Sequence, residues 1–139
     1  MEVKQFVTFK IDEHLLGINI LLVREINRIL DITDVPASRD FVRGLLNLRG
    51  QIITVIDLGV RLGRLPRKVT DESHNIILKA NNAGLLVDSI GDVVRAYENE
   101  IDQPPSNTGG IEEQLISGVV KLKDGLMIIL NINSLLNHL

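Results

Sequence analysis

The amino-acid sequence predicts an all-β protein built from two similar small subdomains. Hydrophobic residues make up 45% of the 139 residues but aromatic residues only 3%, so the core must consist of Ile, Leu and Val. The β-branched members of that set favour strands. Short apolar runs are separated by turn-forming residues, as strands are. In addition, one strand-turn-strand-helix pattern occurs twice.

The first 62 residues predict strands joined by tight turns. Residues 3–11 alternate between two faces, and Val7 and Phe9 fall on the more apolar face. Residues 21–29 fit both a helical and a strand spacing, and we favour a single turn followed by a strand. Arg49-Gly50 forms a turn because glycine tolerates a positive φ. The predicted elements are strands at 3–11 and 15–20, a turn and strand over 21–29, two strands over 44–58 and a short helix at 58–62.

The remaining residues predict a linker and a second set of strands. Residues 65–73 are polar and contain a proline, which makes them the best candidate linker. The prolines and glycines of 103–110 predict a mobile loop. Lys123-Asp124-Gly125 is a favourable hairpin turn. The further predicted elements are strands at 75–80, 84–87, 92–96, 116–122 and 126–130 and a C-terminal helix at 132–139.

Residues 42–62 align without gaps on residues 116–136. Gly44 meets Gly118, Arg49 meets Lys123, and Asp57 meets Asn131 at the start of a helical turn. Alternation alone is shared by any two hairpins, but these three matches are not explained by it. We therefore expect a subdomain at 1–64, to which the helix 132–139 is a candidate addition, and a subdomain at 74–131. Each is marginal alone, so the two are expected to share a hydrophobic core.

Composition and charge exclude several classes of protein. The net charge is −3 and aromatic residues are scarce, which argues against a nucleic-acid-binding protein. The chain has no Cys, so disulfides and Cys-type zinc sites are excluded. No apolar run approaches the ~20 residues of a membrane helix, and the N-terminus does not resemble a signal peptide. These features predict a protein of a reducing compartment without direct membrane insertion.

No motif for catalysis is present. His14, His74 and His138 lie in a turn, a linker and the C-terminus, where solvated histidines are the ordinary expectation. The carboxylates are dispersed over turns and loops, and no GxSxG, P-loop or GxGxxG sequence occurs. We therefore predict no catalytic residues, no metal site and no cofactor, and interpret the chain as a binding module.

Two charged residues and three apolar ones are candidates for partner binding. Arg49 lies in a tight turn and Glu25 in an apolar stretch, and such charges can determine which partner is bound. A solvated turn cation and an outward strand residue are the simpler interpretations, and they remain open. Val7, Ile20 and Val23 could form an exposed apolar docking patch.

Several stretches in order and spacing make the chain resemble the CheW family over nearly its full length, from Phe6 to Leu136. The most specific are Val35-Pro36-Ala37-Ser38-Arg39-Asp40-Phe41-Val42-Arg43-Gly44 and Asn47-Leu48-Arg49-Gly50-Gln51-Ile52-Ile53-Thr54-Val55-Ile56-Asp57-Leu58. Shorter matches are Phe6-Val7-Thr8-Phe9 and Leu16-Gly17-Ile18-Asn19-Ile20, which leads to Val23-Arg24-Glu25-Ile26.

The resemblance implies two SH3-like, five-stranded β-barrels around a joint core, and a non-catalytic adaptor in chemotaxis signal transduction. It implies binding to the regulatory domain of the histidine kinase CheA and to the cytoplasmic tip of a methyl-accepting chemoreceptor. The expected location is the cytoplasm, with recruitment to membrane receptor arrays. By position, the implied kinase-binding residues are Val7, Ile20 and Val23, and the implied receptor-binding residues are Val23, Glu25, Gly44, Arg49 and Val93.

Some residues depart from the family pattern. The family commonly has Asp at the position of Asn19, Pro at that of Thr54 and Arg at that of Gly59. The loop 104–107 lacks an apolar residue that some relatives use for a second kinase contact, so we do not expect that contact. Alternatives are a CheW-like module of a CheV-type coupling protein or of twitching motility, and a small β-barrel ligand-binding protein. A CheV-type coupling protein would need an appended receiver domain. A ligand-binding protein would need polar groups that converge in a pocket.

Overall fold

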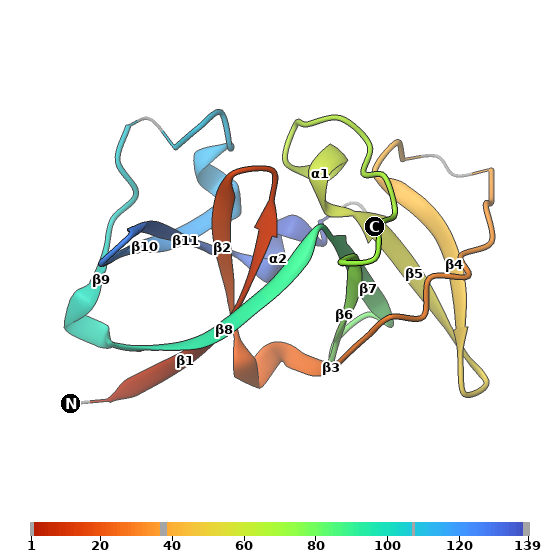
Figure 1. The fold of residues 1–139 in the computed structure, drawn as a ribbon, viewed down its shortest axis with the longest axis horizontal. Helices are drawn as coiled ribbons and strands as arrows, with labels where there is room; N and C mark the ends of the chain where they lie inside the picture. The colour runs from red at the N-terminus through yellow and green to blue at the C-terminus, as the bar shows by residue number, and fades with distance from the viewer. Residues whose placement is uncertain (1, 37–38, 107, 138–139) are drawn as a thin grey trace. The chain divides into compact units, whose positions relative to one another are not determined.

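A computed structural model describes residues 2–36, 39–106 and 108–137 (Figure 1). The described residues are mostly in strands, which confirms the all-β prediction. The strands are β1 (Val3–Ile11), β2 (His14–Asn19), β3 (Val23–Asn27), β4 (Val42–Leu48), β5 (Gln51–Asp57), β6 (His74–Leu78), β7 (Ala83–Val87), β8 (Ser89–Tyr97), β9 (Ile101–Asp102), β10 (Ile116–Leu122) and β11 (Gly125–Leu130). The helical elements are α1 (Leu58–Arg61), α2 (Ile132–Leu135) and the 3-10 turns η1 (Ile20–Leu22), η2 (Glu98–Glu100) and η3 (Glu113–Leu115).

The helical predictions differ from the structure mainly in length. The turn followed by a strand over 21–29 is confirmed as η1 and β3, and the helix at 58–62 as α1. The C-terminal helix was predicted at 132–139, but α2 ends at Leu135 and is therefore shorter. Residues 138–139 of that prediction lie outside the described residues.

The chain divides into two compact units, each with its own sheet. The first unit, Met1–Ile20 with Gly91–Leu139, contains a six-stranded sheet in the order β8-β1-β2-β11-β10-β9. The second unit, Leu21–Ile90, contains a five-stranded sheet in the order β3-β6-β7-β5-β4. The first sheet has one strand more than predicted because the two-residue strand β9 pairs with β10.

The boundary between the units differs from the predicted subdomains at 1–64 and 74–131. The physical reason is a long-range pairing: β2 lies parallel to β11, with Leu16 opposite Ile128, so the N-terminal strands join the C-terminal hairpin. The predicted linker 65–73 lies inside the second unit. Arg67 in this loop is only 9% exposed, and its backbone N–H donates to Asp57 Oδ2 at 2.8 Å. The loop is therefore held in the unit and does not link two units.

The predicted repeat corresponds to β4-β5-α1 and β10-β11-α2. In both copies the first strand has a register shift at the aligned glycine, Gly44 or Gly118. In both, the residue that precedes the helix caps it: Asp57 Oδ1 accepts from Val60 N at 3.1 Å, and Asn131 Oδ1 accepts from Ser134 N at 3.1 Å. A side-chain cap of this kind satisfies an N–H that the helix itself leaves free.

The correspondence extends over both sheets. In each, the second strand of the repeated hairpin lies parallel to one further strand, β5 to β7 and β11 to β2. That strand forms an antiparallel pair with the next, β7 with β6 and β2 with β1. The short pairings agree as well. Thr33 pairs with Leu45 in the second unit, and Asp102 pairs with Val119 in the first unit. Leu45 and Val119 are aligned positions of the repeat. The units are thus similar in topology but differ in the order of their strands along the chain.

Both sheets curl. In the first unit, β8 and β9 are the two ends of the sheet, so in a flat sheet five spacings of about 4.8 Å would separate them by about 24 Å. Only η2 connects them, and it advances about 2 Å per residue, which is far too short for a flat sheet. In the second unit, the Thr33–Leu45 bridge places the segment that follows one end strand, β3, beside the other, β4. Within the described residues no ladder joins the end strands themselves.

Each unit has its own apolar core. In the second unit the buried cluster lies between β4, β5, β6 and β7 and consists of Leu46, Leu48, Ile53, Val55, Ile77 and Leu86. In the first unit it consists of Phe6, Ala96, Val120, Met127 and Ile129. Aliphatic side chains thus supply most of both cores, as the composition predicts.

Candidate partner-binding surface

Three of the predicted site residues lie on the second unit, and two of them are in contact. Val23 and Glu25 lie on β3, and Arg49 lies in the β4–β5 turn with a φ of 49°. The turn is fixed by Asn47, whose Oδ1 accepts from Gly50 N at 2.9 Å. An arginine on so tight a turn is held at a defined place, although its side chain is 67% exposed.

Glu25 and Arg49 form an ion pair. Arg49 Nη2 donates to Glu25 Oε1, and Asn27 Nδ2 donates to Glu25 Oε2 at 3.0 Å. The hydrogen bonds from Asn27 and then Arg49 lower the pKa of Glu25, because both favour the charged carboxylate. The Glu25 side chain is 25% exposed, so the pair presents both charges at the surface.

A second side-chain contact runs beside the ion pair. Arg24 Nη2 donates to Gln51 Oε1 at 2.5 Å, so one residue of β3 reaches the start of β5 and the next reaches the β4–β5 turn. In sheet order β6 and β7 separate β3 from β5, which in a flat sheet would place them about 14 Å apart. The two contacts therefore depend on the curvature of the sheet, which brings β3 to the β4–β5 turn.

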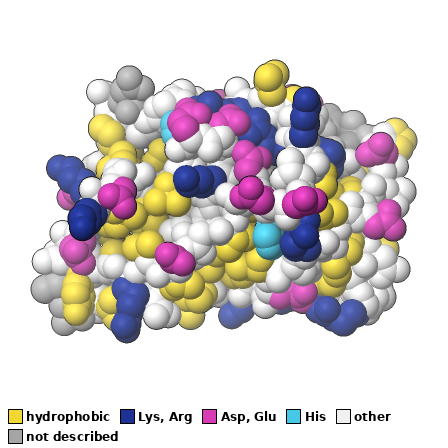
Figure 2. Space-filling model, in the orientation of Figure 1, with side chains coloured by type: hydrophobic (Ala, Val, Ile, Leu, Met, Phe, Trp, Pro, Cys, Tyr) yellow, Lys and Arg dark blue, Asp and Glu magenta, His cyan; other side chains and the backbone are white. Residues whose placement is uncertain are grey.

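Exposed apolar side chains accompany these charges, and hydrophobic side chains are visible between charged ones on the face drawn in Figure 2. Sequence reasoning did not select these residues. The sequence held a signal for one of them, because neighbouring strand residues point to opposite faces, so Ile52 and Ile53 cannot both face the core; in the structure Ile53 is the buried one. The exposed apolar residues on η1, β3 and β5 are Leu21 (71%), Leu22 (42%), Ile26 (36%) and Ile52 (55%).

Two predicted site residues are buried. Val7 is 4% exposed, so it is not part of an exposed apolar patch as expected. Gly44 is buried as well, and a Cβ there would lie 2.3 Å from the carbonyl oxygen of Thr33. Gly44 therefore permits the close approach of the Thr33 segment to β4. Ile20 is half-buried, and Val93 on β8 is 50% exposed.

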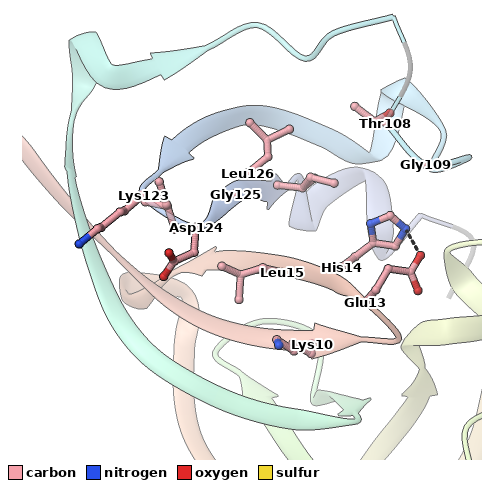
Figure 3. A pocket seen from close by; sticks show the side chains of 12 residues that line it. Lys10, Glu13, His14, Leu15, Thr108, Gly109, Lys123, Asp124, Gly125 and Leu126 are labelled. Carbon is pink, nitrogen blue, oxygen red and sulfur yellow. Dashed lines mark ion pairs between the residues drawn. The ribbon is translucent and has the colours of Figure 1, made fainter.

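The first unit contains a pocket of about 530 Å3 at the β1–β2 and β10–β11 turns (Figure 3). Leu15 and Leu126 line it, and at one side His14 Nε2 lies 3.2 Å from Glu13 Oε1. His14 is the one histidine of this pocket, since His74 is not in its lining and His138 lies outside the described residues. Among the described residues, this pocket therefore does not bring two histidines together.

No group of three or more His, Asp or Glu side chains among the described residues could hold a metal ion. In the same part of the chain, no helix has the length and apolar character to cross a membrane.

Comparisons with known proteins agree on one family. A family model described as the CheW-like domain matches residues 5–139. "Chemotaxis protein CheW" of Treponema pallidum is 33% identical, over 94% of this chain and 81% of the relative. "Chemotaxis protein CheW" of Thermotoga maritima is 32% identical, over 97% of this chain and 89% of the relative. The crystal structure of the scaffolding protein TtCheW from Thermoanaerobacter tengcongensis matches with a TM-score of 0.87 and 36% identity, over 97% of this chain and 88% of that chain.

Proposed function

Because this chain belongs to the CheW family, we propose that it is a non-catalytic adaptor that couples chemoreceptors to the histidine kinase CheA in bacterial chemotaxis. The observation that carries the proposal is the Glu25–Arg49 pair, held on a curved sheet beside exposed apolar side chains. Charges held in place beside an apolar surface suit protein recognition, since apolar contact supplies affinity and charge determines the partner.

The proposal divides the surface of the chain between two partners. Ile20 and Val23 contact the regulatory domain of CheA, and Val7, which is buried, acts on this contact through the packing of β1 in the first unit. Glu25 and Arg49 contact the cytoplasmic tip of the receptor, and Val23 serves both partners. Val93, in the first unit, is a separate exposed apolar residue for receptor contact, whereas Gly44 acts through the backbone packing that it permits.

We propose that the adaptor transmits the signal by holding the receptor and the kinase in a defined position relative to each other. Each contact is modest, but many receptors, kinases and adaptors together form an array in which effective concentration multiplies weak contacts. A change in the receptor then shifts the population of kinase arrangements without chemistry in the adaptor. In this proposal the chain acts in the cytoplasm and is recruited to the membrane by the receptor.

Titration calorimetry with the CheA regulatory domain from the same genome tests the kinase contact, and a soluble receptor-tip fragment tests the receptor contact. We expect Val23→Asp to abolish kinase binding and Arg49→Glu to retain it while it loses receptor binding. Lys123→Glu is a matched control, because Lys123 is the position aligned with Arg49 on the other unit, and it should retain both. If the parent chain does not bind the kinase domain at high concentration, the proposal is wrong.

A further inference from the structure

Asn27 connects the Glu25–Arg49 pair to the backbone that follows β3. Its Oδ1 accepts from Ile29 N at 3.0 Å, and its Nδ2 donates to Glu25 Oε2 at 3.0 Å. The other oxygen of the same carboxylate, Oε1, accepts from Arg49 Nη2. Both ends of the Asn27 amide are therefore used, one on the backbone and one on a residue of the proposed receptor surface.

The hydrogen bond from Ile29 N determines which way the Asn27 amide points. A backbone N–H can only donate, so it requires Oδ1 on its side and turns Nδ2 toward Glu25. In the flipped amide, Nδ2 would face the N–H and Oδ1 would face the carboxylate, so both hydrogen bonds would be lost. Asparagine commonly accepts from the N–H two residues ahead, which makes this a local turn. The donor that Glu25 receives is therefore fixed by the backbone beside it.

The backbone at Ile29 is in turn held by β6 and the residue before it. Asn27 and Asn75 are opposite residues of the β3–β6 ladder. The Asn75 side chain is fully buried, and its Nδ2 donates to the carbonyl oxygen of Ile29 at 2.5 Å. Beside it, Arg28 Nε donates to the carbonyl oxygen of Ser73 at 3.0 Å. The N–H that orients the Asn27 amide thus belongs to a segment with several fixed contacts.

Asn75 indicates that the place of Ile29 matters. Its Oδ1 is buried and has no hydrogen-bond partner among the described residues. A buried polar atom without a partner lowers stability, and an apolar side chain of similar size would avoid this loss. An apolar side chain, however, could not donate to the carbonyl oxygen of Ile29. The amide at this position therefore serves the backbone that follows β3 and not the stability of the core.

We propose that Asn27 is a positioning residue for receptor binding, because it holds the Glu25 carboxylate in one orientation beside Arg49. This inference rests on the proposed function, in which Glu25 and Arg49 contact the receptor. A carboxylate with one oxygen on each neighbour has little freedom left to lose when the receptor binds, which favours binding. The Asn27 amide also stabilises the charged form of Glu25, which lowers the pKa of that carboxyl group.

Titration calorimetry with a soluble receptor-tip fragment tests this proposal on Asn27→Asp and Asn27→Ala. The aspartate keeps an acceptor for Ile29 N, and thus the turn, but places a second carboxylate against Glu25. The alanine removes the amide without adding charge. We expect both variants to bind the receptor fragment about tenfold more weakly than the parent chain. Both should bind the CheA regulatory domain like the parent, which shows that the fold is kept.

Asn99→Asp is the control for charge, since it makes the same chemical change at an exposed position of the first unit. It should bind both partners like the parent. A second measurement follows the carboxylate itself, because the carbon-13 shift of the Glu25 carboxyl group reports its protonation. We expect the pKa of Glu25 to rise in both Asn27 variants, whereas a residue that only supports the fold would leave it unchanged.

The outcomes separate this inference from the proposed function. If the parent chain binds the receptor fragment and Asn27→Ala binds it equally well, Asn27 is not a positioning residue, although the proposed function stands. An unchanged pKa of Glu25 in both Asn27 variants would also overturn the inference. If the parent chain does not bind the receptor fragment, the receptor contact of the proposed function is wrong, and the role of Asn27 is rejected with it.

Discussion

At the residue scale, hydrogen bonds from neighbouring side chains stabilise the charged form of Glu25 at the surface. Asn27 and Arg49 both donate to its carboxylate, and both lower its pKa in the folded state. A folded-state pKa below the unfolded value means that ionisation of Glu25 favours folding. This stabilisation is present above the unfolded pKa, and it is lost as the pH falls through the folded pKa.

Replacing Glu25 by Gln should therefore reduce stability at neutral pH but not in acid. We expect the free energies of unfolding of the parent and Glu25→Gln to differ at pH 7 and to converge well below about pH 4, the range in which a carboxyl group takes up its proton. Urea unfolding at a series of pH values measures this difference. A difference that stays constant down to the lowest pH would show that the pKa of Glu25 is not lowered.

The two aligned capping residues differ in their surroundings, which permits a matched comparison. Asn131 caps α2, and its Oδ1 accepts a hydrogen bond from Ser134 N at 3.1 Å. Asp57 caps α1, accepts from Arg67 N at 2.8 Å and lies 3.3 Å from Arg43 Nη1, with its side chain only 3% exposed. Removing Asp57 therefore leaves Arg67 N without this acceptor and Arg43 without its ion-pair partner, in addition to the lost cap.

We expect Asn131→Ala to lower the free energy of unfolding by about 1 kcal/mol, the usual value of an N-cap. Asp57→Ala should cost more, about 3 kcal/mol, because it also breaks a largely buried charge contact. Urea unfolding of both variants measures the two losses. Equal losses would show that the contacts of Asp57 with Arg43 and Arg67 contribute nothing beyond the cap.

At the scale of elements, the repeated hairpins could be predicted because their signals are local. The aligned glycine, the cation in the turn and the capping Asp or Asn each act within a few residues, and a gapless alignment finds them. Two pairings could not be predicted in this way, those of β9 and of Thr33, because one or two residues show no alternation. The burial of Val7 was missed for a related reason, since alternation assigns a face of β1 but not what covers it.

The aligned glycines predict different tolerance to a methyl group. At Gly44 an added Cβ would lie 2.3 Å from the backbone oxygen of Thr33, whereas at Gly118 the nearest atom is Ile101 Cγ2 at 2.7 Å. A side chain can rotate away more easily than backbone can move. We expect Gly44→Ala to lower the free energy of unfolding by about 3 kcal/mol and Gly118→Ala by about 1 kcal/mol, within the range for overpacked sites. Thermal or urea unfolding checks the order, and a larger loss for Gly118→Ala would contradict it.

At the scale of the whole molecule, the sequence could predict two similar units but not their boundaries. The pairing of β2 with β11 joins residues more than 100 positions apart, and no local pattern indicates such a partner. Residues 65–73 resembled a linker because they are polar, yet Arg67 and Asp57 bind them to the second unit. The residues proposed to bind partners were indicated by the family resemblance, while the curvature that brings Arg49 to Glu25 became visible only in the structure.

The division into units predicts the pattern of hydrogen exchange. Gly118→Ala perturbs the first unit, so amides of β2 should lose protection together with those of β10 and β11, although β2 is far away in sequence. Amides of β6 and β7 should keep the protection of the parent chain. Native-state hydrogen exchange measures all of these strands in one experiment. An equal loss of protection in β6 would show that both units open as one.

The different order of strands in the two units has a consequence for folding during translation. All strands of the second unit have been synthesised once the chain reaches residue 90, so this unit can fold while the ribosome is still at work. In the first unit β1 and β2 are made first, but β2 gains its neighbour β11 only after residues 125–130 follow. At about 5–20 residues per second, the N-terminal hairpin waits between about 5 and 20 seconds with an apolar strand edge unpaired. A chaperone that binds nascent chains would therefore meet this protein first at β2.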